Sequence, residues 1–159
     1  PSDSPDLPDC CAPPFLLSGA THRELDRVSA PAFRARVAPS PAAAASRPAM
    51  GQAQDNLGVL AGSGIPIGFG TDSGPAGRFI GYFEHLEFDL MAEAGLTARE
   101  ILLSATSVAA NCIGLDDVGT LEAGKWADFV VLTENPLADI SATRSIDAVY
   151  IAGNRVNGS

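Results

Sequence analysis

The chain has 159 residues, of which 46% are hydrophobic and only 18% are charged. This length fits one compact domain or a piece of a larger protein, and this composition excludes an intrinsically disordered chain. The formal net charge is -9, because 19 acidic residues outnumber 10 basic ones. A surface of this sign repels phosphate groups, so we expect neither nucleic acid nor a membrane as a partner.

The targeting segments that the sequence lacks, and the spacing of its cysteines, restrict the class of protein further. No stretch reaches the roughly 20 apolar residues of a membrane-spanning helix, and the first residues lack the basic and apolar regions of a secretory signal. The chain begins on Pro1 rather than Met, so we expect that its natural start lies upstream. The compartment stays open, with the cytoplasm slightly favoured. Cys10, Cys11 and Cys112 have no Cys-x-x-Cys spacing, which argues against a disulfide framework or a thiolate zinc site.

The N-terminal third favours loops and helices. Residues 1–14 contain five prolines and are expected to form a loop. Residues 22–28 suit a turn or two of helix, which Pro31 and Pro39 should break. A longer helix is predicted from near Arg47, with Ser46 as its N-cap and Pro48 in its first turn. Its apolar face comprises Met50, Ala53, Leu57, Leu60 and Ala61, and glycines at 62 and 64 end it.

The middle of the chain predicts a strand, a turn and two helices. Residues 65–70 are a short apolar run between glycines, which is typical of a strand buried on both faces. A turn follows at residues 71–75. Apolar residues recur at helical spacing from Phe79 to Met91, which predicts a helix that Gly95 ends. The sequence Thr-Ala-Arg-Glu at residues 97–100 is a capping box that opens a further helix.

After Gly114 the pattern changes to short strands. Residues 126–132 and 146–151 are rich in β-branched and aromatic residues, and Ala152-Gly153-Asn154 suits a tight turn. We therefore divide the chain into a loop-rich segment at 1–40, a strand with flanking helices at 41–114, and a strand-rich part at 115–159.

Asp72 is the first candidate for chemistry. It follows the predicted buried strand directly, in a glycine-flanked turn, which is where α/β folds place ligand-binding groups. A rigidly held carboxylate there suits a metal ligand or a general base. The same pattern also fits an aspartate that only caps the turn through backbone amides, and the spacing alone leaves both open.

Other polar residues of this region are weaker candidates. His85 lies near the start of the next predicted helix, where it could contact substrate or metal, or be a packed histidine. Four acidic residues follow at helical positions, and we interpret them as a solvated helix face rather than a calcium site: Glu84, Glu87, Asp89 and Glu93. No nucleotide-binding, hydrolase-elbow or zincin motif occurs.

A series of motifs in a fixed order carries a family resemblance. It comprises GIPIGFGTDSGP at 64–75, GYFEHLE at 81–87, LMAEAGLT at 90–97, ATSVAA at 105–110 and GTLEAGKWADFVVL at 119–132. Together these resemble the metal-dependent amidohydrolase superfamily, and most closely its imidazolonepropionase and Xaa-Pro dipeptidase-like branch. The resemblance implies an α/β fold: the C-terminal part of a (β/α)8 TIM-type barrel, with residues 64–70 as its last strand, plus strands of a small composite β-sandwich.

The resemblance also implies a reaction and a site. Members hydrolyse C–N bonds, here of amides or cyclic amides, in small-molecule or peptide-like substrates. Asp72 would bind metal and handle the proton of the attacking water, while Ser73, Gly74 and His85 would contact substrate. The implied cofactor is a divalent metal, with zinc as the first expectation, and a homo-oligomer is compatible with the family.

The sequence departs from the family at its metal ligands. It has no His-x-His, its histidines are His22 and His85, and its one lysine, Lys125, falls in the sandwich region. We therefore expect a C-terminal fragment that binds no metal alone and is inactive alone. It would be either part of an active enzyme or a non-catalytic packing or interaction module, and upstream coding sequence would separate these. An incomplete barrel should also leave the isolated chain loosely packed.

Overall fold

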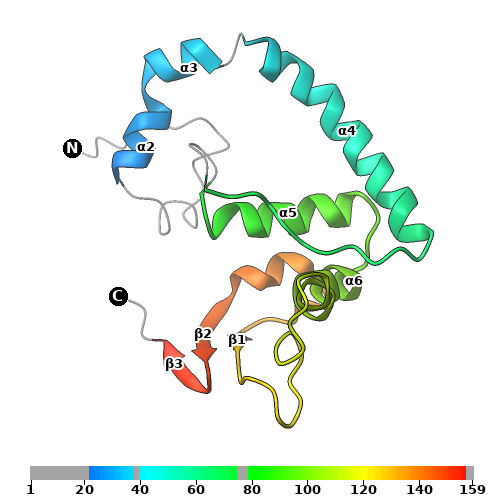
Figure 1. Ribbon diagram of the computed structural model, residues 1–159. Coiled ribbons are helices and arrows are strands. Elements are labelled where there is room, and N and C mark those ends of the chain that lie inside the picture. The colour runs from blue at the N-terminus through cyan, green and yellow to red at the C-terminus, as the bar shows by residue number, and fades with distance from the viewer. Residues whose placement is uncertain (1–21, 38–39, 75–78, 157–159) are drawn as a thin grey trace. The chain divides into compact units, whose positions relative to one another are not determined.

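A computed structural model describes residues 22–37, 40–74 and 79–156 (Figure 1). The chain divides into two compact units. The first unit consists of the described residues up to 53 and of Thr71–Leu86. The second unit consists of Gln54–Gly70 and of the described residues from Glu87 onward. The helices and strands, in chain order, are α2 (His22–Ser29), α3 (Pro31–Val37), α4 (Pro41–Gly62), α5 (Tyr82–Glu93), α6 (Ala98–Leu103), the π-helix η2 (Ser104–Val108), α7 (Ala109–Cys112), β1 (Phe129–Leu132), the 3-10 helix η3 (Ile140–Arg144), β2 (Ile146–Ile151) and β3 (Asn154–Val156).

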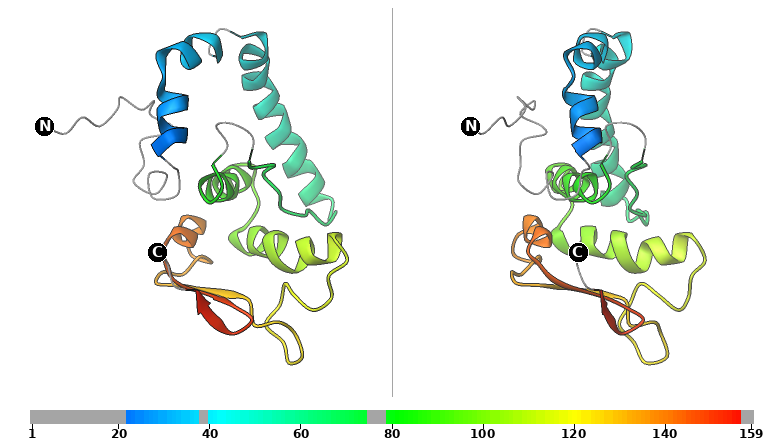
Figure 2. Two further views of the ribbon diagram at one scale, coloured as in Figure 1. Left: turned by 60° about the vertical axis from the view of Figure 1, so that its left-hand side comes forward. Right: turned by 90° about the vertical axis from the view of Figure 1, so that its left-hand side faces the viewer.

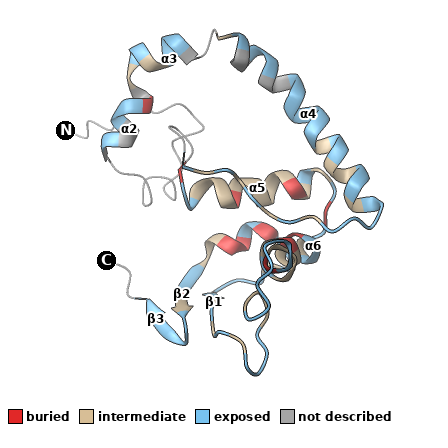
Figure 3. Cartoon of the chain, in the orientation of Figure 1, coloured by how far each residue is buried: buried red, intermediate tan, exposed pale blue. Residues whose placement is uncertain are grey.

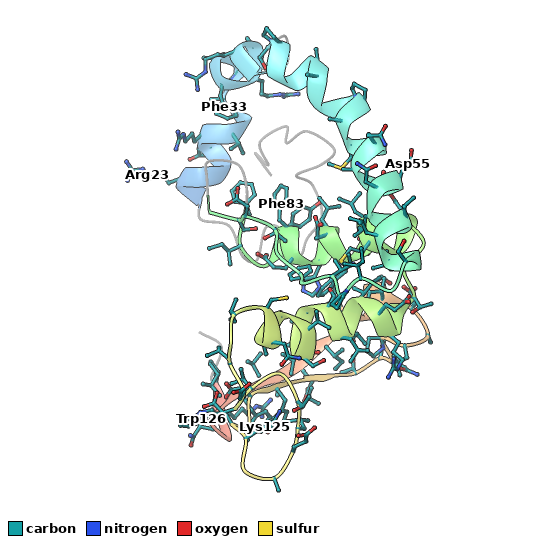
Figure 4. All side chains as sticks on the ribbon, turned by 45° about the vertical axis from the view of Figure 1, so that its right-hand side comes forward. Arg23, Phe33, Asp55, Phe83, Lys125 and Trp126 are labelled. Carbon is teal, nitrogen blue, oxygen red and sulfur yellow. The ribbon has the colours of Figure 1, made fainter. Side chains whose placement is uncertain are left out.

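Prolines begin helices in the first unit. The predicted short helix is confirmed as α2, which ends at Ser29, two residues before Pro31, and Pro31 is in addition the first residue of α3. The reason is that the first position of a helix needs no backbone N–H, and Ala30 supplies the carbonyl that accepts from the Arg34 amide at 3.1 Å. Val28 and Phe79 form a small core with Phe33, Tyr82 and Phe83, of which Phe33 and Phe83 are labelled in Figure 4. Pro39 lies outside the described residues.

Helix α4 begins earlier than the sequence suggested. The prediction of a start near Arg47 is wrong, because Pro41 opens the helix and the Ser40 carbonyl accepts from the Ala44 amide at 3.1 Å. Pro48 therefore sits inside α4, where it removes one backbone hydrogen bond. The alanine-rich first turns supply enough helix propensity to continue through it.

Residues 65–70 do not form the predicted doubly buried strand. Among the described residues the only sheet consists of β1, β2 and β3, so this segment has no ladder partner. It is extended, and its amides donate to helix carbonyls: Ile65 to Leu60 at 3.4 Å and Phe69 to Ser104 at 3.1 Å. Only Ile67 and Phe69 pack on the core, whereas Ile65 is 49% exposed. A strand forms only when a neighbouring strand accepts its hydrogen bonds.

The second unit has the larger core. Met91 of α5, Leu96, Ile101 of α6 and Ile140 of η3 are its buried residues, and Leu57 of α4 packs against them. Ile101 is completely buried, which is worth about 1.5–3 kcal/mol relative to exposure. Figure 3 shows buried residues gathered on α5 and η3, while most of α4 is exposed.

The helix that opens at Thr97 is confirmed, with one unpredicted feature. The capping box is present, since the Thr97 hydroxyl accepts from the Glu100 amide and the Glu100 carboxylate accepts from the Thr97 amide. Helices α6, η2 and α7 then follow without a break, as one coil in Figure 2. The middle turn is a π-helix, a widened turn that is frequent at functional sites.

The C-terminal strands form an antiparallel sheet in the order β1-β2-β3 (Figure 2). Phe129 pairs with Tyr150 and their rings stack at 4.5 Å, and Val149 pairs with Val156. Ala152 and Gly153 both have positive φ, 51° and 76°, as the tight turn predicted there requires. Strand β1 begins at Phe129, three residues later than the predicted run. None of the described helices combines the length and apolar character that a membrane crossing needs.

Candidate active site

Asp72 lies in a turn between the extended residues 65–70 and α5. Its side chain is exposed, and its backbone has φ +52°, in the left-handed region that residues with a Cβ rarely adopt. Aspartate tolerates this region better than most residues, but such a conformation still costs about 1–3 kcal/mol. Gly74, two residues later, has φ +121°, which suits glycine. The surroundings must therefore hold this turn in place.

Glu84, in the first turn of α5, accepts the hydrogen bonds that hold residues 71–74 in place. The Thr71 hydroxyl donates to Glu84 Oε1 at 3.0 Å, and the Gly81 amide donates to Glu84 Oε2. The Thr71 and Ser73 hydroxyl oxygens are 2.6 Å apart, and the Ser73 amide donates to Thr71 Oγ1 at 3.2 Å. The residues on both sides of Asp72 are thus connected to one carboxylate.

The protonation of Glu84 follows from these contacts. Partial burial by itself raises its pKa, but hydrogen bonds from its own amide, from Ser73, from Gly81 and from Thr71 outweigh that effect. The net result is a pKa below the ordinary value for glutamate, because each of these donors stabilises the charged form. At neutral pH Glu84 is therefore a carboxylate that only accepts hydrogen bonds.

The remaining predicted site residues have mixed environments. Ser73 is half-buried and close to Glu84, Gly74 is exposed, and His85 is buried on α5 at 9% exposure. Burial of His85 fits both interpretations of the sequence, a packed histidine and one that faces a pocket. The substrate-contacting roles of Ser73, Gly74 and His85 stay predictions.

The interpretation of the four acidic residues as a solvated helix face holds for Glu93, whereas Glu84, Glu87 and Asp89 are half-buried. Glu84 braces the turn, Asp89 forms a two-pronged ion pair with Arg144 at 2.6 and 3.2 Å, and burial raises the pKa of Glu87. Glu93 is exposed and accepts from Gln54 at 3.0 Å. Helical spacing does not specify these partners, because they lie up to 55 residues away along the chain.

Sequence reasoning therefore missed Glu84 as a functional candidate. One local signal was available, since Glu84 stands three residues after Gly81 at the start of a predicted helix. A glutamate at that position commonly accepts from the amide that precedes the helix. Its bond to Thr71, thirteen residues away, has no such local signal.

The described residues do not build a metal centre. They contain no group of three His, Cys, Asp or Glu side chains placed to hold a metal ion. Asp72 can supply one ligand, whereas catalytic zinc normally has three from protein. Lys125, on the loop before β1 in Figure 4, lies 3.6 Å from Glu122. Cys112 is a free, exposed thiol.

Comparison with known proteins identifies the family. A model of the amidohydrolase family matches residues 17–156. The chain belongs to the amidohydrolase family. Relatives include a 5-methylthioadenosine/S-adenosylhomocysteine deaminase of Bacillus cereus, 28% identical over 127 residues, which are 76% of this chain and 28% of the deaminase. The family prediction is thereby confirmed.

Solved structures of amidohydrolases agree with this assignment. An Xaa-Pro dipeptidase with methionine bound in its active site is 32% identical, with a TM-score of 0.60, over 66% of this chain and 25% of the dipeptidase. Molinate hydrolase is 26% identical, with a TM-score of 0.61, over 65% of this chain and 26% of that enzyme. The chain thus spans about a quarter of the length of these relatives, and it has a partial amidohydrolase-like fold of helices and a small antiparallel sheet.

Proposed function

We propose that this chain is the C-terminal part of a metal-dependent hydrolase that acts on C–N bonds of amides or cyclic amides. The observation that carries the proposal is Asp72, an exposed carboxylate in a braced turn directly after residues 65–70. The relatives support the reaction class, since a deaminase and a dipeptidase both break a bond between carbon and nitrogen.

In this proposal residues 64–70 are the last strand of a (β/α)8 barrel, and the strands after Gly119 belong to a small β-sandwich. The order of elements supports this placement, because α4, an extended segment and α5 alternate as in such barrels. The neighbouring strands would come from the part of the complete protein that this chain does not cover. Active sites of these barrels lie at the carboxyl ends of the strands, and Asp72 would lie at that end if residues 64–70 complete the barrel.

Asp72 acts on the proton of the hydrolytic water. Its carboxylate accepts that proton as water attacks the carbon of the scissile bond, and then passes it to the nitrogen that leaves. Asp72 also offers one ligand to a divalent metal, zinc being the first expectation. The described residues do not fit a complete metal centre, so the other ligands would lie in the remainder of the protein.

The substrate is a small molecule or is peptide-like. Ser73 and Gly74 follow Asp72 in the same turn, and the absence of a side chain at Gly74 lets a substrate approach the backbone closely. His85, on α5, is proposed to line the pocket. Each of these contacts is weaker support than the position of Asp72.

Kinetics of the complete enzyme test the proposal. Asn at position 72 keeps the shape of the side chain but removes its basicity, so Asp72→Asn should lower kcat about 100- to 10,000-fold with little change in KM. His85→Ala should lower kcat less. Asp55→Asn, the same change at an exposed position of α4 that Figure 4 labels, should leave kcat unchanged.

Two results would contradict this assignment. Normal turnover by a fully metallated Asp72→Asn enzyme would return Asp72 to a turn-capping role. A natural reading frame without an upstream His-x-His would favour the alternative, a non-catalytic packing or interaction module.

A further inference from the structure

We propose that Glu84 is a positioning residue, which holds residues 71–74 in place and thereby orients the Asp72 carboxylate. The inference rests on the function proposed for Asp72. Glu84 itself faces the Thr71 hydroxyl and the Gly81 amide, so it acts through the turn and not on substrate.

The hydrogen bonds define a directed chain. The Thr71 hydroxyl has a single proton, which it donates to Glu84 Oε1. In its 2.6 Å contact with Ser73, Thr71 can then only accept, so the single proton of the Ser73 hydroxyl is shared between Thr71 Oγ1 and the Glu84 carboxylate. Thr71 Oγ1 also accepts from the Ser73 amide at 3.2 Å, which occupies its second lone pair. These hydrogen bonds of Thr71 and Ser73 therefore lead to one acceptor group, the Glu84 carboxylate.

The backbone of Asp72 explains why such an anchor is needed. With φ +52°, Asp72 has a more relaxed conformation available to it. Thr71 before it and Ser73 after it are both restrained by the Glu84 network, so Asp72 is held between two fixed points. Release of Glu84 would free Thr71 first and then allow the Asp72 backbone to relax.

A carboxylate suits this position better than an amide. Glu84 uses one oxygen for Thr71 and the other for Gly81. A glutamine keeps one acceptor oxygen but places an NH2 group, which only donates, at the other position. Glu84→Gln must therefore leave either the Thr71 hydroxyl or the Gly81 amide without its acceptor.

The chain offers a matched control in Glu100. It stands at the third position of α6 and accepts from the Thr97 amide at 2.7 Å, as Glu84 accepts from the Gly81 amide. Glu100→Gln thus removes the same kind of helix cap without touching residues 71–74. Thr71→Val serves as calibration, because it deletes the acceptor of the Ser73 amide and leaves the Glu84 cap on Gly81 intact.

The first measurement uses the full 159-residue chain. Hydrogen exchange of the Ser73 amide is followed by mass spectrometry with fragmentation to single residues. We expect exchange about tenfold faster in Thr71→Val and in Glu84→Gln than in the wild type, and no change in Glu100→Gln. Unchanged exchange in Glu84→Gln, or an equal increase in Glu100→Gln, would overturn the inference.

The second measurement uses steady-state kinetics of the complete enzyme. Glu84→Gln should lower kcat about ten- to hundredfold while KM stays close to normal, because misplacement of a catalytic group affects the reacting step. If Asp72→Asn abolishes turnover but Glu84→Gln retains normal kcat, the positioning role is wrong and the proposed function stands. If Asp72→Asn is fully active, the proposed function is wrong. The positioning role of Glu84 is then wrong as well, even if the exchange of the Ser73 amide changes as expected.

Discussion

Gly119 illustrates how single residues set the packing beside α7. A Cβ added at Gly119 would lie 2.8 Å from Ala110 Cβ and 2.9 Å from the Thr106 carbonyl oxygen. Its φ of +84° also disfavours any residue with a side chain. The loop after α7 therefore approaches the π-helical turn so closely that only hydrogen fits between them.

We predict that Gly119→Ala destabilises the chain by about 1–3 kcal/mol through overpacking, in addition to its backbone strain. Gly124→Ala is the control, because Gly124 has φ +92° but nothing within 4 Å of the added Cβ. Urea denaturation measures both variants. Equal losses of unfolding free energy would mean that the close contact contributes nothing.

At the scale of elements, two contacts between segments distant in sequence join parts of the second unit. The capping box fixes where the coil starts, and the Ser104 carbonyl at the beginning of the π-helix accepts from the Phe69 amide. The Arg144–Asp89 ion pair joins η3 to α5 in the same unit. The Phe69–Ser104 hydrogen bond and the Asp89–Arg144 ion pair each couple residues distant in sequence, so the stability of the unit should be most sensitive to substitution at these two contacts.

The cap of α6 should make stability depend on pH. Hydrogen bonds from the side chain and then the backbone of Thr97 lower the pKa of Glu100 below its ordinary value. A carboxyl group with a lowered pKa in the folded state stabilises the fold above its unfolded pKa, and this contribution is lost as pH falls through the folded pKa. The cap is therefore complete at neutral pH and weakens in acid.

We expect the wild type to be more stable than Glu100→Gln at neutral pH, with a difference that shrinks as pH falls below the usual glutamate range. Urea midpoints across this range measure the difference. The pKa of Asp139 is lowered too, by Ser141, but Asp139 is present in both proteins and cancels from the comparison. A difference that stays constant with pH would show that the charge on Glu100 has no role.

At the scale of the whole molecule, large apolar side chains remain at the surface. In the sheet these are Val130 at 50%, Ile151 at 58% and Val156 at 45% exposure, and Trp126 on the preceding loop is 54% exposed. Water-exposed apolar groups in one region favour association. Within the amidohydrolase family this face suits further strands of a sandwich, which is part of the proposed function.

We predict that the isolated chain self-associates under reducing conditions, which exclude a disulfide through Cys112. Sedimentation velocity should show larger species whose share grows with concentration. Val130→Lys, which places a charge on the exposed sheet position, should reduce association without lowering the unfolding free energy. A monodisperse wild-type monomer with a sharp cooperative melt would contradict the prediction. The domain division at residues 40 and 114 remains a prediction as well.

The sequence by itself determined the local elements and the family. The capping box at Thr97, the end of α5 before Gly95 and the turn at Ala152 depend on neighbouring residues, so their signals lie within a few positions. The ordered motifs from Gly64 to Leu132 identified the amidohydrolase family for the same reason, since each is a short contiguous pattern.

The tertiary structure alone decided what depends on distant partners. Residues 65–70 have the composition of a strand. A strand forms only where a second segment pairs with it through backbone hydrogen bonds, and no segment among the described residues pairs with residues 65–70 in this way. Glu84 has the spacing of a surface residue, yet Thr71 makes it the anchor of the Asp72 turn. Hydrogen bonds across many residues are set by the packing of the chain, which the local spacing of residues does not encode.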